Sequence, residues 1–152
     1  MQIRRYRESD FNALHQLDQA CYPPGIAYSR YALRAFLAEP GAQAFVAEQE
    51  AGVIGFVLVA REGRVRGHII TLDVATGHRR RGVGRALLER AEQWLAAQGI
   101  AQVWLETAVD NEAAVAFWQK SGYRQCRVLP RYYLDRIDAY QMEKNLERMA
   151  RR

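Results

Sequence analysis

A chain of 152 residues, 49% hydrophobic and 11% aromatic, has the size and composition of one globular domain over residues 1–152, which needs neither disulfides nor a metal ion to fold. The net charge of +5 would suit a polyanionic partner, but it is only a moderate excess of 22 Lys and Arg over 17 Asp and Glu. No nucleic-acid partner is expected, because the one arginine cluster is compact and has no aromatic stacking platform beside it. The first residues lack a signal-peptide pattern and no apolar run reaches the roughly 20 residues of a membrane span, so a cytoplasmic protein without membrane contact is expected.

The N-terminal segment is predicted to form a strand and two helices. Ile3–Arg5 is the strand, Ser9 caps the first helix, and Ser29 caps the second. The segment CYPPGIAYS between the helices is a predicted loop, because Pro-Pro-Gly interrupts regular structure. Cys21 begins this loop. Neither it nor Cys126 has the spacing of a zinc site or a redox pair, so both are expected to be reduced core residues.

Three β-rich runs follow, at Ala44–Glu48, Val53–Ala60 and His68–Val74. Short turns containing glycine separate them, which predicts an antiparallel meander. From Val83 the apolar residues take a helical period, and Gly99 ends that helix.

The next strand, Ala101–Thr107, follows a helix that itself follows a strand. This order predicts a β-α-β unit with parallel neighbouring strands. Asp110 or Asn111 caps a short helix that Gly122 ends. The last predicted elements are two strands around a loop and a frayed basic tail: Tyr123–Leu129, Ile137–Glu143 and residues 147–152. We expect an α+β fold with a mixed, mostly antiparallel sheet of about six or seven strands and helices on both faces.

Residues 79–84, RRRGVG, form the turn between the third β-rich run and its helix. A helix start binds anions through its unpaired backbone N–H groups, and Gly82 and Gly84 let a ligand approach the backbone closely. Arginines surround the glycines and can pair with phosphate. A P-loop would need Lys-Ser or Lys-Thr after the glycines, and a dinucleotide site would need GxGxxG. Both are excluded, and the alternative to an anion site is a tight turn with solvated arginines.

The segment TLDVATGHRRRGVGRALLERAEQWL resembles the acetyl-CoA-binding motif of the GNAT superfamily of N-acetyltransferases. The order of the predicted elements is also similar to that family's over nearly the whole chain. The resemblance implies a GNAT fold, acetyl-CoA as donor and coenzyme A as product. It implies that the backbone of Leu72, Asp73 and Val74 pairs with the pantetheine arm. The residues that it assigns to the pyrophosphate are Arg79, Arg80, Arg81, Gly82, Val83, Gly84 and Arg85.

The segment LETAVDNEAAVAFWQKSGY resembles the matching stretch of the ribosomal-protein alanine N-acetyltransferases. The resemblance implies that Glu106 is the general base and that Asn111 contacts the cofactor. Without it, Glu106 would be an ordinary solvated glutamate on a strand. His68 on the neighbouring strand is a candidate partner, because imidazole titrates near neutral pH, although a lone strand histidine can also be structural.

Trp118 departs from the family pattern, which has a tyrosine at this position to protonate the departing thiolate. An indole N–H can donate to sulfur but does not ionise usefully. Either Trp118 takes over part of this role, or a tyrosine such as Tyr132 or Tyr133 replaces it.

The segment PRYYLDRIDAYQMEKNL resembles the loop and last strand of protein N-terminal acetyltransferases. The resemblance implies that Tyr132 and Tyr133 lie in a loop over the peptide entrance, with Tyr22, Pro23 and Tyr28 on the opposite wall. The expected acceptor is the N-terminal α-amine of a peptide or protein, and the enzyme is expected to be a monomer or homodimer. Two alternatives stay open: an acetyltransferase of a small amine, polyamine or lysine side chain, and a non-catalytic acyl-CoA-binding module.

Overall fold

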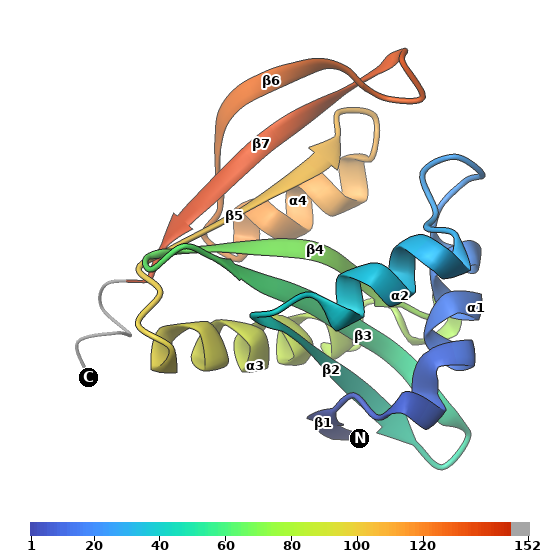
Figure 1. The fold of residues 1–152 in the computed structure, drawn as a ribbon. Helices are drawn as coiled ribbons and strands as arrows, with labels where there is room; N and C mark the ends of the chain where they lie inside the picture. The colour runs from blue at the N-terminus through green and yellow to red at the C-terminus, as the bar shows by residue number, and fades with distance from the viewer. Residues whose placement is uncertain (147–152) are drawn as a thin grey trace.

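A computed structural model describes residues 1–146 of the chain, so the predicted basic tail at 147–152 lies outside the described residues. Within residues 1–146 the chain forms one seven-stranded sheet in the order β1-β2-β3-β4-β5-β7-β6, with helices on both faces (Figure 1). The strands are β1 (Gln2–Arg5), β2 (Ala42–Gln49), β3 (Gly52–Glu62), β4 (Arg66–Val74), β5 (Gln102–Ala108), β6 (Arg124–Tyr133) and β7 (Ile137–Asn145). The helices are α1 (Phe11–Cys21), α2 (Arg30–Ala38), α3 (Val83–Ala97) and α4 (Glu112–Lys120), with short 3-10 turns η1 (Glu8–Asp10) and η2 (Thr76–His78). The predicted α+β class is confirmed.

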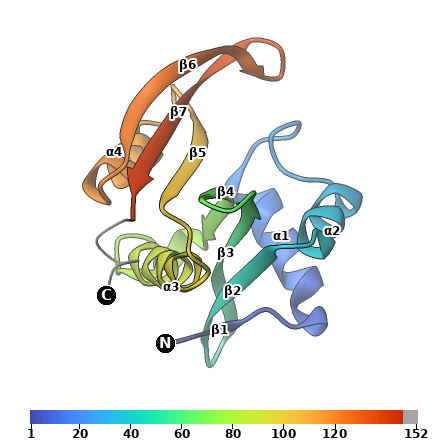
Figure 2. The same cartoon turned by 60° about the vertical axis from the view of Figure 1, so that its left-hand side comes forward.

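Strand β4 precedes α3 in the chain and β5 follows it, and the two strands are parallel neighbours in the sheet. The predicted β-α-β unit is therefore confirmed. In the described part of the chain they pair only where Arg66–His68 faces Gln102–Trp104. Beyond His68 the two strands diverge, so that β1 to β4 and β5 to β7 separate into two parts of one sheet (Figures 1 and 2). The divergence leaves one edge of β4 without a strand partner.

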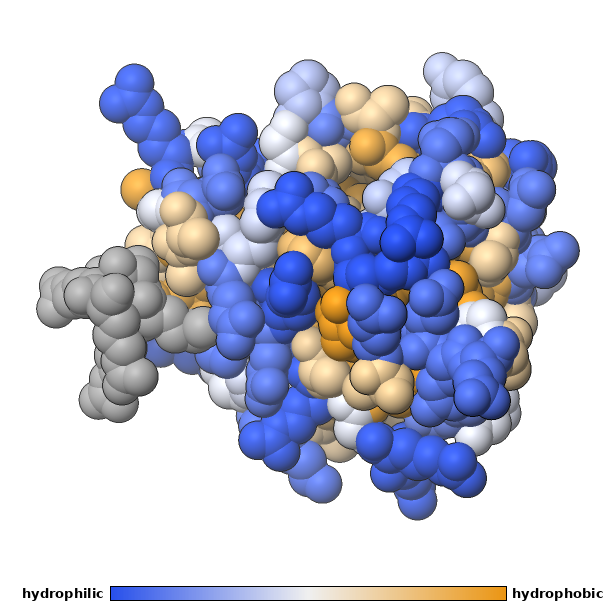
Figure 3. Space-filling view, turned by 90° about the horizontal axis from the view of Figure 1, so that it is seen from below, coloured by the Kyte–Doolittle hydropathy of each residue, from blue (hydrophilic) through white to orange (hydrophobic). Residues whose placement is uncertain are grey.

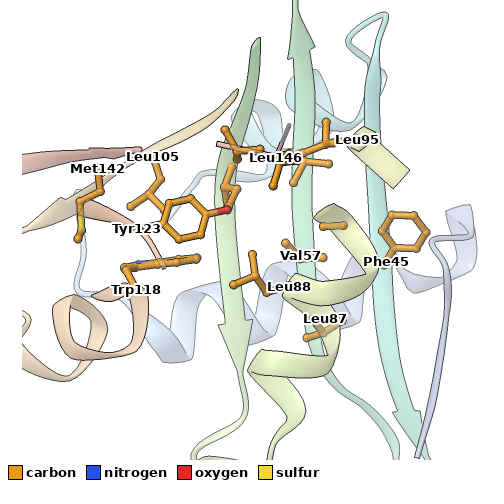
Figure 4. Close-up of a cluster of buried hydrophobic side chains, with 14 of the residues drawn as sticks. Phe45, Val57, Leu87, Leu88, Leu95, Leu105, Trp118, Tyr123, Met142 and Leu146 are labelled. Carbon is orange, nitrogen blue, oxygen red and sulfur yellow. The ribbon is translucent and has the colours of Figure 1, made fainter. Parts of the chain in front are cut away.

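The sheet buries a separate core on each face, because strand side chains alternate between faces. Residues Phe45, Val57 and Ile69 pack with α3 on one face. Their neighbours in sequence point the other way, and Val46 and Phe56 pack with α1 and α2. The core on the α3 side extends to α4, where Trp118, Tyr123, Leu105 and Met142 meet (Figure 4).

Several predicted helix ends are confirmed. Ser29 caps α2 by accepting a hydrogen bond from the backbone N–H of Ala32 at 3.1 Å. Gly99 and Gly122 follow α3 and α4 with positive φ angles of 83° and 96°. The predicted cap at Ser9 is wrong: Ser9 lies inside η1, and α1 begins after Asp10.

The β6–β7 hairpin is longer than predicted. Strand β6 runs to Tyr133, so the adjacent tyrosines Tyr132 and Tyr133 end a strand rather than lie in a loop. Periodicity did not extend β6 this far because Pro130 interrupts it and the register shifts between Leu129 and Tyr133. Cys126, expected in the core, is exposed on β6, whose outer edge pairs with no strand among residues 1–146.

The face that lies at the bottom of Figure 1, where α3 lies, carries mainly hydrophilic residues with scattered apolar ones between them (Figure 3). No helix within residues 1–146 is both long enough and apolar enough to cross a membrane.

Candidate functional site

A histidine and a glutamate meet at the point where β4 and β5 diverge. The Nε2 atom of His68 lies 2.9 Å from Oε1 and 3.1 Å from Oε2 of Glu106, a hydrogen-bonding distance to both carboxylate oxygens. The Glu106 side chain is 8% exposed, which excludes the solvated strand glutamate. His68 is the last β4 residue of the three-residue parallel pairing, and Glu106 lies two residues beyond its pairing partner Trp104, so strand register brings the two side chains together.

Three tyrosines from two segments, the end of β6 and the α1–α2 loop, lie around Glu106. The hydroxyl of Tyr133 donates a hydrogen bond to the Glu106 backbone carbonyl at 3.3 Å, and the rings of Tyr132 and Tyr133 pack edge to face at 4.8 Å. On the opposite side, the Tyr28 hydroxyl donates to the carbonyl of Ile70 at 3.4 Å. Burial, and then the negative charge of Glu106, raises the pKa of all three phenols above the usual value for tyrosine, so they stay neutral donors near neutral pH.

Beyond His68, successive residues of β4 direct their backbone N–H and C=O groups alternately to β3 and to the gap left by β5. The N–H of Ala75 pairs with Ile54 on β3, so by alternation Asp73 also points its backbone groups to β3, whereas Leu72 and Val74 point theirs to the gap. The Tyr22 hydroxyl already donates to the carbonyl of Leu72 at 3.2 Å. Of the three residues expected to offer backbone groups to the cofactor, Leu72 and Val74 are so placed and Asp73 is not.

The turn before α3 has the geometry of an anion site. Gly82 caps the helix in the left-handed conformation with φ 84°, and the first helical hydrogen bond runs from Ala86 N–H to the Gly82 carbonyl. The N–H groups of Val83, Gly84 and Arg85 therefore precede the first helical pair and are open to a ligand. A Cβ on Gly82 would meet no atom within 4 Å, so the approach to these groups is open.

The arginines of this turn differ in placement. Arg80 adopts a positive φ of 62°, and Arg80 and Arg81 are both exposed. Arg85 pairs with Glu89 one helical turn on, at 3.2 Å. Arg79 instead donates through Nε to the Val74 carbonyl at 3.1 Å, so its guanidinium is held beside β4.

Two further predicted residues lie apart from the His68–Glu106 pair. Asn111 is the N-cap of α4, accepting from the N–H of Ala114 at 3.2 Å, and its amide is exposed. Trp118 is 7% exposed and packs edge to face against Tyr123 at 5.4 Å (Figure 4). It lies in the core with Leu105, on the opposite face of β5 from Glu106. Pro23, the last predicted wall residue, is exposed and accepts two backbone hydrogen bonds in the α1–α2 loop.

Sequence reasoning missed a buried carboxyl pair beneath this site. Asp18 on α1 and Asp73 on β4 are 0% and 1% exposed. Asp18 accepts from the N–H of Tyr28 at 2.7 Å, and Asp73 accepts from the hydroxyl of Thr71 at 2.6 Å. Each keeps one oxygen without another partner in the described part of the chain, and burial together with Asp18 raises the pKa of Asp73 well above its ordinary value. The raised pKa favours the protonated form of Asp73, while Asp18 holds the α1–α2 loop through the N–H of Tyr28.

The raised pKa of Asp73 predicts a stability loss at high pH. A carboxyl group whose pKa is raised by folding contributes stability that is complete below its ordinary pKa near 4 and is lost as pH rises through the raised value. Within that window each pH unit lowers the free energy of unfolding by about 1.4 kcal/mol, or the melting temperature by about 3–6 °C.

Asp73→Asn tests this prediction, because its amide can donate to Asp18 at any pH. We expect melting curves from pH 4 to pH 9 to show a smaller decline for this variant than for the wild type. The exposed Asp110→Asn serves as control, and parallel declines for Asp73→Asn and the wild type would contradict a raised pKa of Asp73.

A second missed feature is the surroundings of His68. Its ring stacks on Trp104 with centroids 4.0 Å apart, and the Trp104 indole N–H donates to Glu62 at 2.8 Å. Strand alternation places Trp104 and Glu106 on one face, but nothing short-range in the sequence points to Glu62.

Comparison with known proteins gives a consistent family. Residues 11–123 match the model of the acetyltransferase (GNAT) family. An N-alpha-acetyltransferase of Sulfurisphaera tokodaii is 29% identical over 92% of this chain and 90% of its own length. N-alpha-acetyltransferase 30 of Schizosaccharomyces pombe is 33% identical over 74% of this chain and 78% of its own length. The crystal structure of Chaetomium thermophilum Naa20 in complex with a bisubstrate analogue superposes with a TM-score of 0.83 and 28% identity, covering 100% of this chain and 90% of that one.

Proposed function

Because the chain belongs to the GNAT family of acetyltransferases, we propose that it transfers the acetyl group of acetyl-CoA to the N-terminal α-amine of a peptide or protein. The observation that carries this proposal is the buried Glu106–His68 pair, set between tyrosines from two walls at the divergence of β4 and β5. The names of the N-alpha-acetyltransferase relatives support the choice of acceptor.

The described residues fit acetyl-CoA along one path. The open N–H groups of Val83, Gly84 and Arg85, with Arg80 and Arg81 nearby, suit the pyrophosphate. The edge groups of Leu72 and Val74 suit the amides of the pantetheine arm. We propose that Arg79, held beside β4, and Asn111, through its exposed amide, also contact the cofactor. When bound, acetyl-CoA supplies an activated thioester carbonyl.

The proposed chemistry at the acceptor needs a base. Glu106 accepts a proton from the incoming ammonium, directly or through water, and His68 holds the carboxylate in place through Nε2. The leaving thiolate needs one proton. Trp118 faces the other side of β5, so Tyr133 or Tyr132 beside Glu106 is the better placed donor.

The walls favour a peptide over a polyamine. Tyr28, Tyr132 and Tyr133 present neutral hydroxyls and aromatic surface next to Glu106, which suits a peptide backbone and one side chain. Tyr22 and Pro23 belong to the same loop as Tyr28 and complete that wall. A polyamine site would need several carboxylates. Of the other carboxyls near this site, Asp18 and Asp73 are buried, and Glu62 already accepts from the indole N–H of Trp104.

The remaining expectations from the sequence stay predictions. These are one domain over residues 1–152, a cytoplasmic location, a monomer or homodimer, and no nucleic acid or membrane as partner. A non-catalytic acyl-CoA-binding module would lack a use for the buried Glu106–His68 pair, which is why we favour catalysis.

The test is turnover on a panel of acceptors. We expect kcat/KM for unblocked peptides with varied first residues to exceed that for spermidine, small amines and N-terminally blocked lysine peptides by at least about 10-fold, because only a peptide engages both tyrosine walls. The measurement is the rate at which the coenzyme A thiol is released with each acceptor at equal concentration. Activity on polyamines alone would contradict the proposal, and acetyl-CoA binding without turnover on any amine would favour the non-catalytic module.

A further inference from the structure

The imidazole of His68 faces a second carboxylate besides Glu106. While Nε2 contacts Glu106 at 2.9 Å, Nδ1 lies 3.9 Å from Oε2 of Glu62 at the end of β3. The two ring nitrogens thus point toward acids on different strands. The 3.9 Å separation is within ion-pair range and can be bridged by one water or closed by a small side-chain adjustment.

Trp104 holds this arrangement. Its indole ring lies 4.0 Å from the His68 ring at an interplanar angle of 10°, which fixes the plane of the imidazole. Its N–H donates to Oε1 of Glu62 at 2.8 Å, which leaves Oε2 to face His68. The Arg66 guanidinium lies 5.4 Å from the same ring centre, so the indole is restrained further. The turn between β3 and β4 brings Glu62 beside the start of β5 (Figure 1).

Exposure rises steadily along this row of side chains. The exposed fraction is 8% for Glu106, 17% for His68 and 44% for Glu62. The row therefore connects a buried carboxylate at the proposed acetylation site with a carboxylate that is in contact with solvent.

We propose that Glu62, positioned by Trp104, completes a proton relay from Glu106 through His68 to solvent. This inference rests on the proposed acetyl transfer. In that reaction the N–C bond forms as the C–S bond breaks, and an ammonium with three N–H bonds becomes an amide with one. Of the two protons lost, one ends on the sulfur of coenzyme A and one must leave the site. At rest the imidazole carries its proton on Nε2 and donates it to the Glu106 carboxylate. Once Glu106 has taken the ammonium proton, the tautomer with its proton on Nδ1 accepts from Glu106 at Nε2. The Nδ1 proton then passes to Glu62 and on to water, which leaves the imidazole with its proton on Nε2 again.

The role of Glu62 can be tested without changing Glu106, the proposed base. Glu62 touches neither Glu106 nor the tyrosine walls in any hydrogen bond of the described chain, so it is a positioning and relay residue rather than a catalytic one. Glutamine at position 62 can still accept from Trp104 but cannot take a proton. Phenylalanine at position 104 can still stack on His68 but no longer holds Glu62.

The test measures kcat and KM separately for Glu62→Gln with an α-amine peptide. A positioned base contributes about 10²–10⁴-fold, and a group one step removed, which water can partly replace, is expected to give a loss of about 10-fold in kcat. KM for the peptide and for acetyl-CoA should stay unchanged. Added acetate or imidazole buffer should restore part of kcat in a concentration-dependent way, because a small base substitutes for the missing carboxylate. Trp104→Phe should give a smaller loss that does not add to that of Glu62→Gln.

Glu50→Gln, an exposed change in the turn between β2 and β3, serves as the matched control and should match the wild type. No turnover by the wild type would mean that the proposed function has failed, independently of the relay. With an active wild type, an unchanged kcat for Glu62→Gln would overturn the relay. A loss through KM, or one that buffer does not restore, would also overturn it and leave Glu62 a purely structural role.

Discussion

Replacing Glu106 with glutamine is expected to lower kcat by about 10²–10⁴-fold, because an amide of nearly the same shape cannot accept the proton of the acceptor ammonium. The variant should fold normally, since glutamine can keep a hydrogen bond to His68 at the 2.9 Å contact. KM for acetyl-CoA should be unchanged, because the cofactor path runs along β4 and the start of α3. Steady-state kinetics with an α-amine peptide, alongside a melting curve, gives the result.

The matched control is Glu112→Gln in the first turn of α4, where the side chain is exposed. It should retain the wild-type kcat. If Glu106→Gln also retained it, Glu106 would be a structural carboxylate and the mechanism would need another base.

Gly84→Trp is expected to abolish measurable binding of acetyl-CoA. A Cβ at this position would lie 3.4 Å from the Phe117 ring and 3.7 Å from the Val74 side chain. Gly84 therefore lies at the start of α3 beside Val74 of β4, between the two backbone segments proposed to hold the cofactor, and an indole there is too large for the space beside them. Isothermal titration with acetyl-CoA measures the loss, which we expect to exceed about 100-fold in Kd, or about 2.7 kcal/mol.

A large side chain at Gly84 can also disturb packing, so two comparisons accompany it. Gly84→Ala adds only the Cβ, at ordinary contact distance, and should bind more weakly than the wild type but still detectably. Gly77→Trp places the same indole where a Cβ meets no atom within 4 Å, and it should bind like the wild type. Tight binding by a folded Gly84→Trp variant would remove the cofactor path described above.

The elements that depend on local sequence were predictable. Ser29 and Asn111 lie at caps because their short polar side chains accept backbone N–H groups, and Gly99 ends α3 because it takes a positive φ. The parallel pairing of β4 and β5 followed from element order alone. Ser9 was misplaced because residues on either side of it can start a helix equally well, and here η1 precedes α1.

The errors in the C-terminal half have a different cause. The length of the β6–β7 hairpin depends on pairing between strands, which a single-strand pattern does not contain. Tyr132 and Tyr133 therefore belong to a strand, stabilised in part by the Arg131 N–H donating to Asp138 at 2.8 Å. Cys126 is exposed because β6 is an edge strand, a fact set by the strand order of the whole sheet.

The candidate site was predictable only in part. His68 and Glu106 could be proposed from the family resemblance and from neighbouring strands, and they lie within hydrogen-bonding distance. The Asp18–Asp73 pair and the Trp104–Glu62 contact join residues far apart in sequence, so only the folded chain brings them together. Asn111 keeps its predicted cofactor contact as a proposal beside its capping role, whereas Trp118 packs in the core on the face of β5 opposite Glu106.

Acetylation of an α-amine is tested most directly by locating the acetyl group on a peptide that has two kinds of amine. A peptide that carries both a free N-terminus and an internal lysine is incubated with the protein and acetyl-CoA, and the product is fragmented in a mass spectrometer. We expect one acetyl group, located on the N-terminal α-amine, whose appearance requires Glu106. Acetyl found on the lysine side chain instead, or no acetyl on any peptide while a small amine is acetylated, would contradict it.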